Sequence, residues 1–116
     1  MDRKTKGRLA ESKVVSYLIE NGYEAYLPFS NNSKYDILAV KDGIIKRISV
    51  KFTSVKNKSG AWAVELRQIS RRNHRINIDK FDNSEYDFVA VYIGPQNKVV
   101  LIDAAMVKTR ALLIRD

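Results

Sequence analysis

Hydrophobic positions near the start of the chain recur at the spacing of an α-helix. Between residues 5 and 21, the apolar side chains on this spacing are Ala10, Val14, Tyr17 and Leu18. Gly22 follows directly, where a helix commonly ends with a residue in the left-handed conformation. The pattern predicts an N-terminal helix over residues 5–21, about four turns long.

Two strand-like segments follow, residues 35–41 and 44–53. Only Asp42-Gly43 separates them, a pair that is typical of a two-residue hairpin turn. We therefore expect an antiparallel hairpin in which Lys41 faces Ile44.

This register brings three polar side chains to one face of the hairpin. Asp36 lies directly opposite Ser49, and Lys51 is one diagonal step away. The other face carries an apolar set that suits burial, consisting of Ile37, Ala39, Ile48, Val50 and Phe52. The polarity at positions 36, 49 and 51 is therefore a feature of a strand face.

The remaining segments complete an α/β domain. We expect a short strand over residues 23–29 and a third antiparallel strand over 61–66, with Trp62, Val64 and Leu66 on one side. Residues 86–93 are almost continuously apolar, as in a central strand covered on both faces. A strand over 99–102, a short helix over 104–107 and a last strand over 111–114 follow. These elements predict a mixed sheet of about five strands packed against the N-terminal helix.

Positive charge is concentrated in residues 70–75, Ser-Arg-Arg-Asn-His-Arg, which show no apolar periodicity and are expected to form an exposed loop. Arginines on such a segment can bind phosphates or read guanine edges. The residues expected to contact double-stranded DNA are Arg67, Arg71, Arg72, His74 and Arg75. The alternative is a solvated loop without a ligand. His74, the only histidine, has no second His or Cys nearby, which favours a DNA contact or a bystander over a catalytic base.

Composition narrows the class of partner. The 116 residues suffice for one domain, residues 1–116, and include 21 Lys and Arg against 13 Asp and Glu, a formal net charge of +8. Nucleic acid is thus favoured over an anionic membrane surface. The absence of cysteine excludes disulfides and thiolate metal sites. With no apolar leader or membrane-spanning run, we expect a soluble, cytoplasmic protein with no membrane partner.

Two carboxylates and one lysine are candidates for chemistry. Glu11 lies beside the apolar stripe of its helix, so its carboxylate points toward the sheet that presents Asp36. Two carboxylates with waters suit Mg²⁺. The Lys51 ammonium can orient an attacking water or stabilise charge at phosphorus. Taken singly, Glu11 also fits a rim glutamate paired with a lysine, and Lys51 a solvated strand lysine.

In order and spacing these residues resemble the PD-(D/E)XK nucleases of the restriction-endonuclease fold. That family has a helix glutamate, an aspartate at a strand start, a short hairpin, and then carboxylate-any-lysine. The corresponding segments here are Gly7-Arg8-Leu9-Ala10-Glu11, Tyr35-Asp36-Ile37-Leu38 and Ile48-Ser49-Val50-Lys51-Phe52. The order of the later segments is most similar to bacterial group I intron-encoded homing endonucleases, and next to archaeal Holliday junction resolvases.

Ser49 departs from that family pattern, which places Glu, Asp or, in the homing subgroup, Gln at this position. A serine hydroxyl is shorter and a weak metal ligand. Either Glu11 and Asp36 suffice with waters, or Glu65 on the neighbouring strand substitutes, or catalysis is impaired.

The resemblance implies a restriction-endonuclease-like fold that hydrolyses DNA phosphodiesters with Mg²⁺ or Mn²⁺. It assigns catalysis to Glu11, Asp36, Ser49 and Lys51, and metal binding to Glu11 and Asp36. Cutting both strands needs two centres, so we expect a homodimer or a higher symmetric oligomer, with residues 112–114 as a candidate interface. The alternatives are a Holliday junction resolvase, a DNA-binding protein without catalysis, and an RNA- or ribosome-binding domain supported by charge alone.

Overall fold

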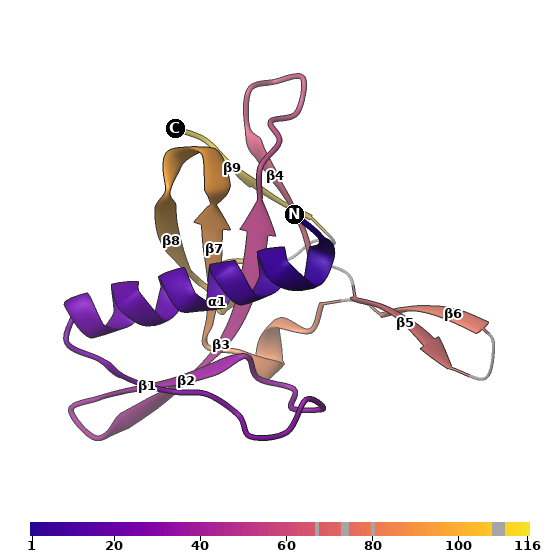
Figure 1. Ribbon diagram of the computed structural model, residues 1–116. Coiled ribbons are helices and arrows are strands. Elements are labelled where there is room, and N and C mark those ends of the chain that lie inside the picture. Colours follow the sequence, from indigo (N-terminus) through magenta and orange to yellow (C-terminus); the bar gives the residue numbers. More distant parts are fainter. Residues whose placement is uncertain (67, 73–74, 80, 108–110) are drawn as a thin grey trace.

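One long helix lies across a five-stranded mixed sheet, and two further strand pairs adjoin it (Figure 1). The computed structural model describes residues 1–66, 68–72, 75–79, 81–107 and 111–116, with the backbone alone for 68–72 and 75–79. The helix is α1 (Arg3–Glu20), and the sheet strands in spatial order are β1 (Glu24–Tyr26), β2 (Ile37–Lys41), β3 (Ile44–Thr53), β7 (Phe88–Ile93) and β8 (Lys98–Asp103). The predicted fold class is confirmed.

The other elements are shorter. The adjoining strand pairs are β4 (Trp62–Glu65) with β9 (Ala111–Ile114), and β5 (Gln68–Arg72) with β6 (Arg75–Asp79). Short 3-10 helices are η1 (Asn83–Glu85), η2 (Gly94–Gln96) and η3 (Ala104–Met106).

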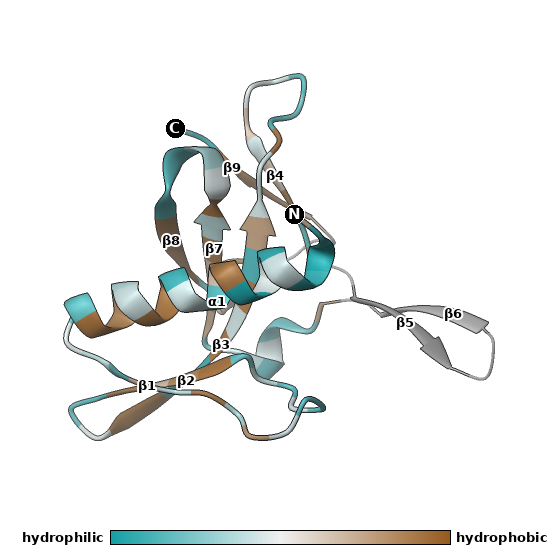
Figure 2. Cartoon of the chain, in the orientation of Figure 1, coloured by the Kyte–Doolittle hydropathy of each residue, from teal (hydrophilic) through white to brown (hydrophobic). Residues whose placement is uncertain are grey.

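α1 begins two residues earlier than predicted because Asp2 caps it. The Asp2 carboxylate accepts a hydrogen bond from the Thr5 backbone N–H at 2.7 Å. After the helix ends, Gly22 adopts a φ of 85°, and the Tyr23 N–H donates to the Leu18 carbonyl at 2.9 Å. The first turns of α1 are strongly hydrophilic (Figure 2), whereas its buried side chains are those expected, Ala10, Val14 and Leu18.

β2 and β3 form the predicted hairpin. Lys41 faces Ile44, and the antiparallel register continues through five residue pairs. Asp42 and Gly43 in the turn have φ values of 53° and 77°, as a two-residue type I′ turn requires. The register that follows from the turn is therefore confirmed.

β7 is the central strand, parallel to β3 and antiparallel to β8. It separates two apolar layers, one against α1 and one against the β4–β9 pair. The buried residues of the α1 layer are Val14, Leu18, Ile37, Ala39, Ile48 and Ala90. Those of the other layer include Trp62, Val64, Leu66, Val89 and Val91. Both faces of the sheet beside β3 are thus covered.

Three expectations needed correction. The strand expected over residues 23–29 is confined to β1, because Pro28 has no N–H to donate to a ladder. The segment 61–66 is a strand with Trp62, Val64 and Leu66 buried, but it pairs with β9 outside the main sheet. The segment 70–75 was expected to be a loop, but residues 70–72 belong to β5 and Arg75 to β6, which pair antiparallel. Residues 73 and 74 lie outside the described residues.

Candidate functional site

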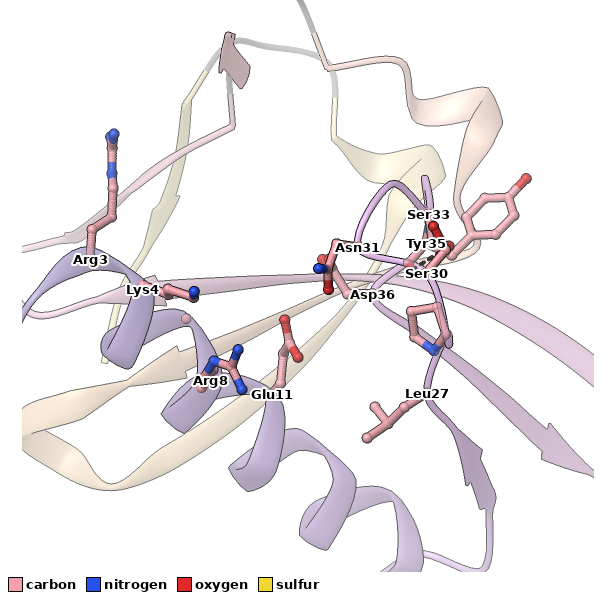
Figure 3. Close-up of a pocket in the computed structure, with 12 residues that line it drawn as sticks. Arg3, Lys4, Arg8, Glu11, Leu27, Ser30, Asn31, Ser33, Tyr35 and Asp36 are labelled. Atoms are coloured by element: carbon pink, nitrogen blue, oxygen red, sulfur yellow. Dashed lines mark hydrogen bonds between the residues drawn. The ribbon is translucent and has the colours of Figure 1, made fainter.

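Glu11 and Asp36 line one cavity of about 380 Å³. One wall of the cavity is the first half of α1, and the other is formed by residues of the segment 27–36 that leads into β2. Glu11 extends from the helix toward Asp36 (Figure 3). The structure therefore brings together the two carboxylates that the sequence singled out, from segments 25 residues apart in the chain.

Asp36 is fixed by the β3 backbone. Its N–H donates to the Ile48 carbonyl at 3.1 Å, and its Oδ2 accepts from the Val50 N–H at 2.7 Å. Burial raises the pKa of the Asp36 carboxyl above its ordinary value, against the opposing effects of the Val50 hydrogen bond and the Lys51 charge. Within the described residues, Asp36 Oδ1 accepts no hydrogen bond. This oxygen is available to a ligand.

Glu11 is held less tightly. Burial, followed by the charge of Asp36, raises the pKa of the Glu11 carboxyl, and the charge of Arg8 opposes the rise. Among the described residues its carboxylate makes no hydrogen bond or ion pair. Two carboxylates that repel each other in a partly buried cavity are both stabilised in their charged forms by a cation.

Lys51 stands beside Asp36 on β3. Burial lowers the pKa of its ammonium group, while the charges of Asp36 and Glu65 oppose that effect. Lys51 is not among the residues that line the cavity, so its link to the site is its interaction with Asp36. Glu65, at the end of β4, is linked to the site through its electrostatic interaction with Lys51.

Ser49 is buried, with 3% of its surface exposed, and its backbone pairs with Val89 of the central strand. It does not line the cavity either. The sequence placed this hydroxyl at a corner of the site, whereas the structure encloses it between strands. Little of the Ser49 surface is exposed for direct contact with a ligand.

The number of carboxylates in the cavity limits how many protein ligands a metal ion could have. In the described part of the chain, no group of three or more His, Cys, Asp or Glu residues is arranged to hold a metal ion. Glu11 and Asp36 thus form a two-carboxylate donor set, and the remaining oxygen ligands of a Mg²⁺ ion would come from water or substrate.

Three of the five residues expected to contact DNA belong to the β5–β6 hairpin, which extends away from the body of the molecule (Figure 1). Arg71 and Arg72 are the last residues of β5, and Arg75 is the first of β6, where it pairs with Arg72. Arg67 and His74 lie outside the described residues.

The cavity also contains cationic residues that the sequence interpretation had not singled out. Arg3, Lys4 and Arg8 line the wall formed by α1, and Asn31 and Tyr35 lie on the facing segment. The signal was present in the sequence, since Lys4, Arg8 and Glu11 follow the i, i+4, i+7 spacing of one helical face.

Comparisons with known proteins found similarity to one protein family and to a solved structure. A family model described as PD-(D/E)XK endonuclease matches residues 1–115. Among solved structures, a bacterial homing endonuclease, I-Ssp6803I, superposes with a TM-score of 0.84 at 17% sequence identity, covering 100% of this chain and 80% of that one. A search of curated proteins gave no match. In the described residues, no helix has the length and apolar character needed to span a membrane.

Proposed function

The chain belongs to the PD-(D/E)XK endonuclease family, and from that premise we propose that it hydrolyses DNA phosphodiester bonds with a divalent cation, as a sequence-specific homing endonuclease. The observation that carries this proposal is the convergence of Glu11 and Asp36 on one cavity, with Lys51 beside Asp36. The fold that the chain shares with a homing endonuclease supports it.

The donor set fits Mg²⁺ or Mn²⁺. Glu11 and Asp36 would hold the ion, and relief of their mutual repulsion would favour its binding. Once bound, such an ion supplies positive charge that neutralises the phosphodiester and makes a nearby water more acidic. Because Asp36 is fixed through Val50, its carboxylate needs little reorganisation to accept a ligand.

The reaction itself is a displacement at phosphorus. A water oxygen forms the new bond to phosphorus and releases one proton to solvent, the bond to one ester oxygen breaks, and that leaving oxygen takes up a proton from solvent. Lys51 in its charged form would stabilise the negative charge that grows on the phosphoryl oxygens. Burial lowers the pKa of this ammonium group, and the charge of Asp36 opposes that effect.

Incubation with supercoiled plasmid and Mg²⁺ tests the proposal. We expect nicked and linear products that EDTA suppresses. Discrete fragments from a long DNA would support sequence-specific cutting, whereas preferential binding and cutting of four-way junctions would identify a resolvase. Persistent absence of nicking, while DNA still shifts in a gel, would leave a DNA-binding protein without catalysis.

We further propose that two copies act together, because each chain offers one such site and a duplex has two strands. The residues expected at an interface are only partly available. Leu112 and Ile114 of β9 pack against the core, while Leu113 is 51% exposed. Sedimentation of the protein with and without duplex DNA tests the expected dimer, and a monomer under both conditions would contradict it.

A further inference from the structure

The cavity that holds the carboxylates changes charge along α1. Glu11 and Asp36 occupy one end, while Arg3, Lys4 and Arg8 line the helix wall toward its start (Figure 3). A single cavity thus contains three positive and two negative side chains. The opposite wall carries no charged side chain before Asp36 and offers hydroxyl and amide groups from Ser30, Asn31, Ser33 and Tyr35.

Within the described residues, the interaction recorded for these three cations is electrostatic, between Arg8 and the Glu11 carboxyl. None forms a salt bridge or a side-chain hydrogen bond, and all three residues are exposed. Several other basic residues of the described chain differ, since Lys34, Arg47 and Lys56 pair with carboxylates, and Lys13 lies over the Tyr92 ring. Helix stability does not explain the three cations either. Arg3 and Lys4 lie in the first turn, where positive side chains oppose the helix dipole, and the turn itself adds no acidic residue to the N-cap Asp2.

Gly7 lies one helical turn after Arg3 and one turn before Glu11, and it also lines the cavity. A Cβ built there would meet nothing within 4 Å. Glycine inside a helix is unfavourable by about 1 kcal/mol relative to alanine, so its position is not explained by packing or by helix propensity. Its effect is to leave the cavity open between the positive and the negative side chains.

We propose that Arg3, Lys4 and Arg8 bind the backbone phosphates next to the scissile phosphate, on the same DNA strand. Along the helix axis Arg8 is about 4.5 Å and Lys4 about 10.5 Å from Glu11. Phosphates of one strand advance about 3.4 Å along the duplex per nucleotide, so the spacing spans roughly one to three nucleotides. α1 would thus hold the strand in position while Glu11 and Asp36 act on it. This inference rests on the proposed function.

Salt-dependent binding provides the first test. The affinity of the protein for a labelled linear DNA duplex is measured in EDTA at a series of salt concentrations. The proteins compared are wild type, Arg8→Gln, and a triple variant that combines Arg3→Gln, Lys4→Gln and Arg8→Gln. We expect the slope of log affinity against log salt to fall by about one for each cation removed, with a several-fold loss of affinity for Arg8→Gln. The matched control is Lys13→Gln, which removes the same charge from the same helix but outside this cavity. Slopes equal to that of the control would overturn the proposal.

Gly7→Leu provides a second test that separates binding from folding. Leucine favours the helix, so the melting temperature should stay level or rise. The side chain should enter the cavity, weaken DNA binding and lower kcat for nicking. Unchanged binding and nicking in a folded Gly7→Leu protein would contradict a strand path through this cavity.

The two proposals can fail separately. If wild type nicks DNA and the cation variants behave like Lys13→Gln in slope, KM and kcat, the phosphate contacts are wrong and the nuclease stands. If the salt slope falls as expected in the cation variants but wild type never nicks DNA, the proposed phosphate contacts stand and the proposed nuclease activity is wrong. Failure of wild type to bind duplex DNA would overturn both.

Discussion

The two halves of the candidate site are held in different ways. Asp36 belongs to the sheet, because it exchanges hydrogen bonds with the backbone on both sides of Ser49. Glu11 is placed only by the packing of α1 on the sheet, and its carboxylate has no hydrogen bond among the described residues. The strand half is thus rigid and the helix half adjustable. A site built in this way can fix one ligand oxygen and let the other adapt to the bound ion.

Isosteric substitution should produce the largest effect. Asp36→Asn retains an oxygen that can accept a hydrogen bond from the Val50 N–H but loses the negative charge. We expect the rate of nicking to fall by more than about 100-fold, because substitution of residues that only support metal ligands already lowers activity by about 10 to 100-fold. Glu11→Gln should cost less if Glu11 is the adjustable half. Initial rates of plasmid nicking at saturating Mg²⁺ measure both. Equal losses would show that both halves are equally constrained.

Truncation to alanine should separate the halves by stability. Asp36→Ala removes the acceptor of the part-buried Val50 N–H, which costs about 1–3 kcal/mol. Glu11→Ala removes a carboxylate without a hydrogen bond and should change the free energy of unfolding by less than about 0.5 kcal/mol. Urea unfolding in EDTA measures both values. A larger loss for Glu11→Ala would reverse the comparison.

Ser49→Gln tests the packing of β3 next to Asp36. The serine is enclosed beside Val89, so a longer side chain should overpack the interior and cost about 1–3 kcal/mol. Because Ser49 does not line the cavity, we also expect no gain in nicking. Ser49→Ala is the matched control and should remain close to wild type in stability. A large gain in nicking by Ser49→Gln would show instead that this position supplies a missing group of the site.

The smallest expected effect is the pH dependence of stability at Glu11. Because folding raises its pKa, the carboxyl contributes stability below its ordinary pKa, and this contribution is lost as the pH rises through the raised value. Glu11→Gln, which does not titrate, should therefore match wild type near pH 4 and exceed it at pH 7, by less than about 0.5 kcal/mol. Thermal unfolding in EDTA at the two pH values measures the difference. A variant less stable than wild type at pH 7 would contradict the raised pKa.

Sequence analysis succeeded where local rules determine the structure. Asp42-Gly43 fixes the turn, the turn fixes the register, and the register places Asp36 and Lys51. The apolar face of α1 follows from helical periodicity in the same way. This is why the family resemblance was recognisable from short motifs.

Prediction failed where the outcome depends on distant partners. Nothing in the alternation of residues 61–66 indicates that the strand pairs with β9, some fifty residues later, rather than with the hairpin. The burial of Ser49 depends on β7, which is equally remote. The cations of the cavity were missed because a helix and a loop join to form it, and neither segment alone shows a cavity.

The parallel pairing of β3 with β7 also bears on the order of folding. The β2–β3 hairpin needs only a two-residue turn, whereas β7 must return across more than thirty residues before it can pair with β3. Local pairing of this kind forms fast and long-range pairing slowly. We therefore expect a nascent chain to assemble the Asp36 contacts with β3 before β7 arrives. The Asp36 side of the site would form first. Slow docking of β7 would delay activity without disturbing the position of Asp36.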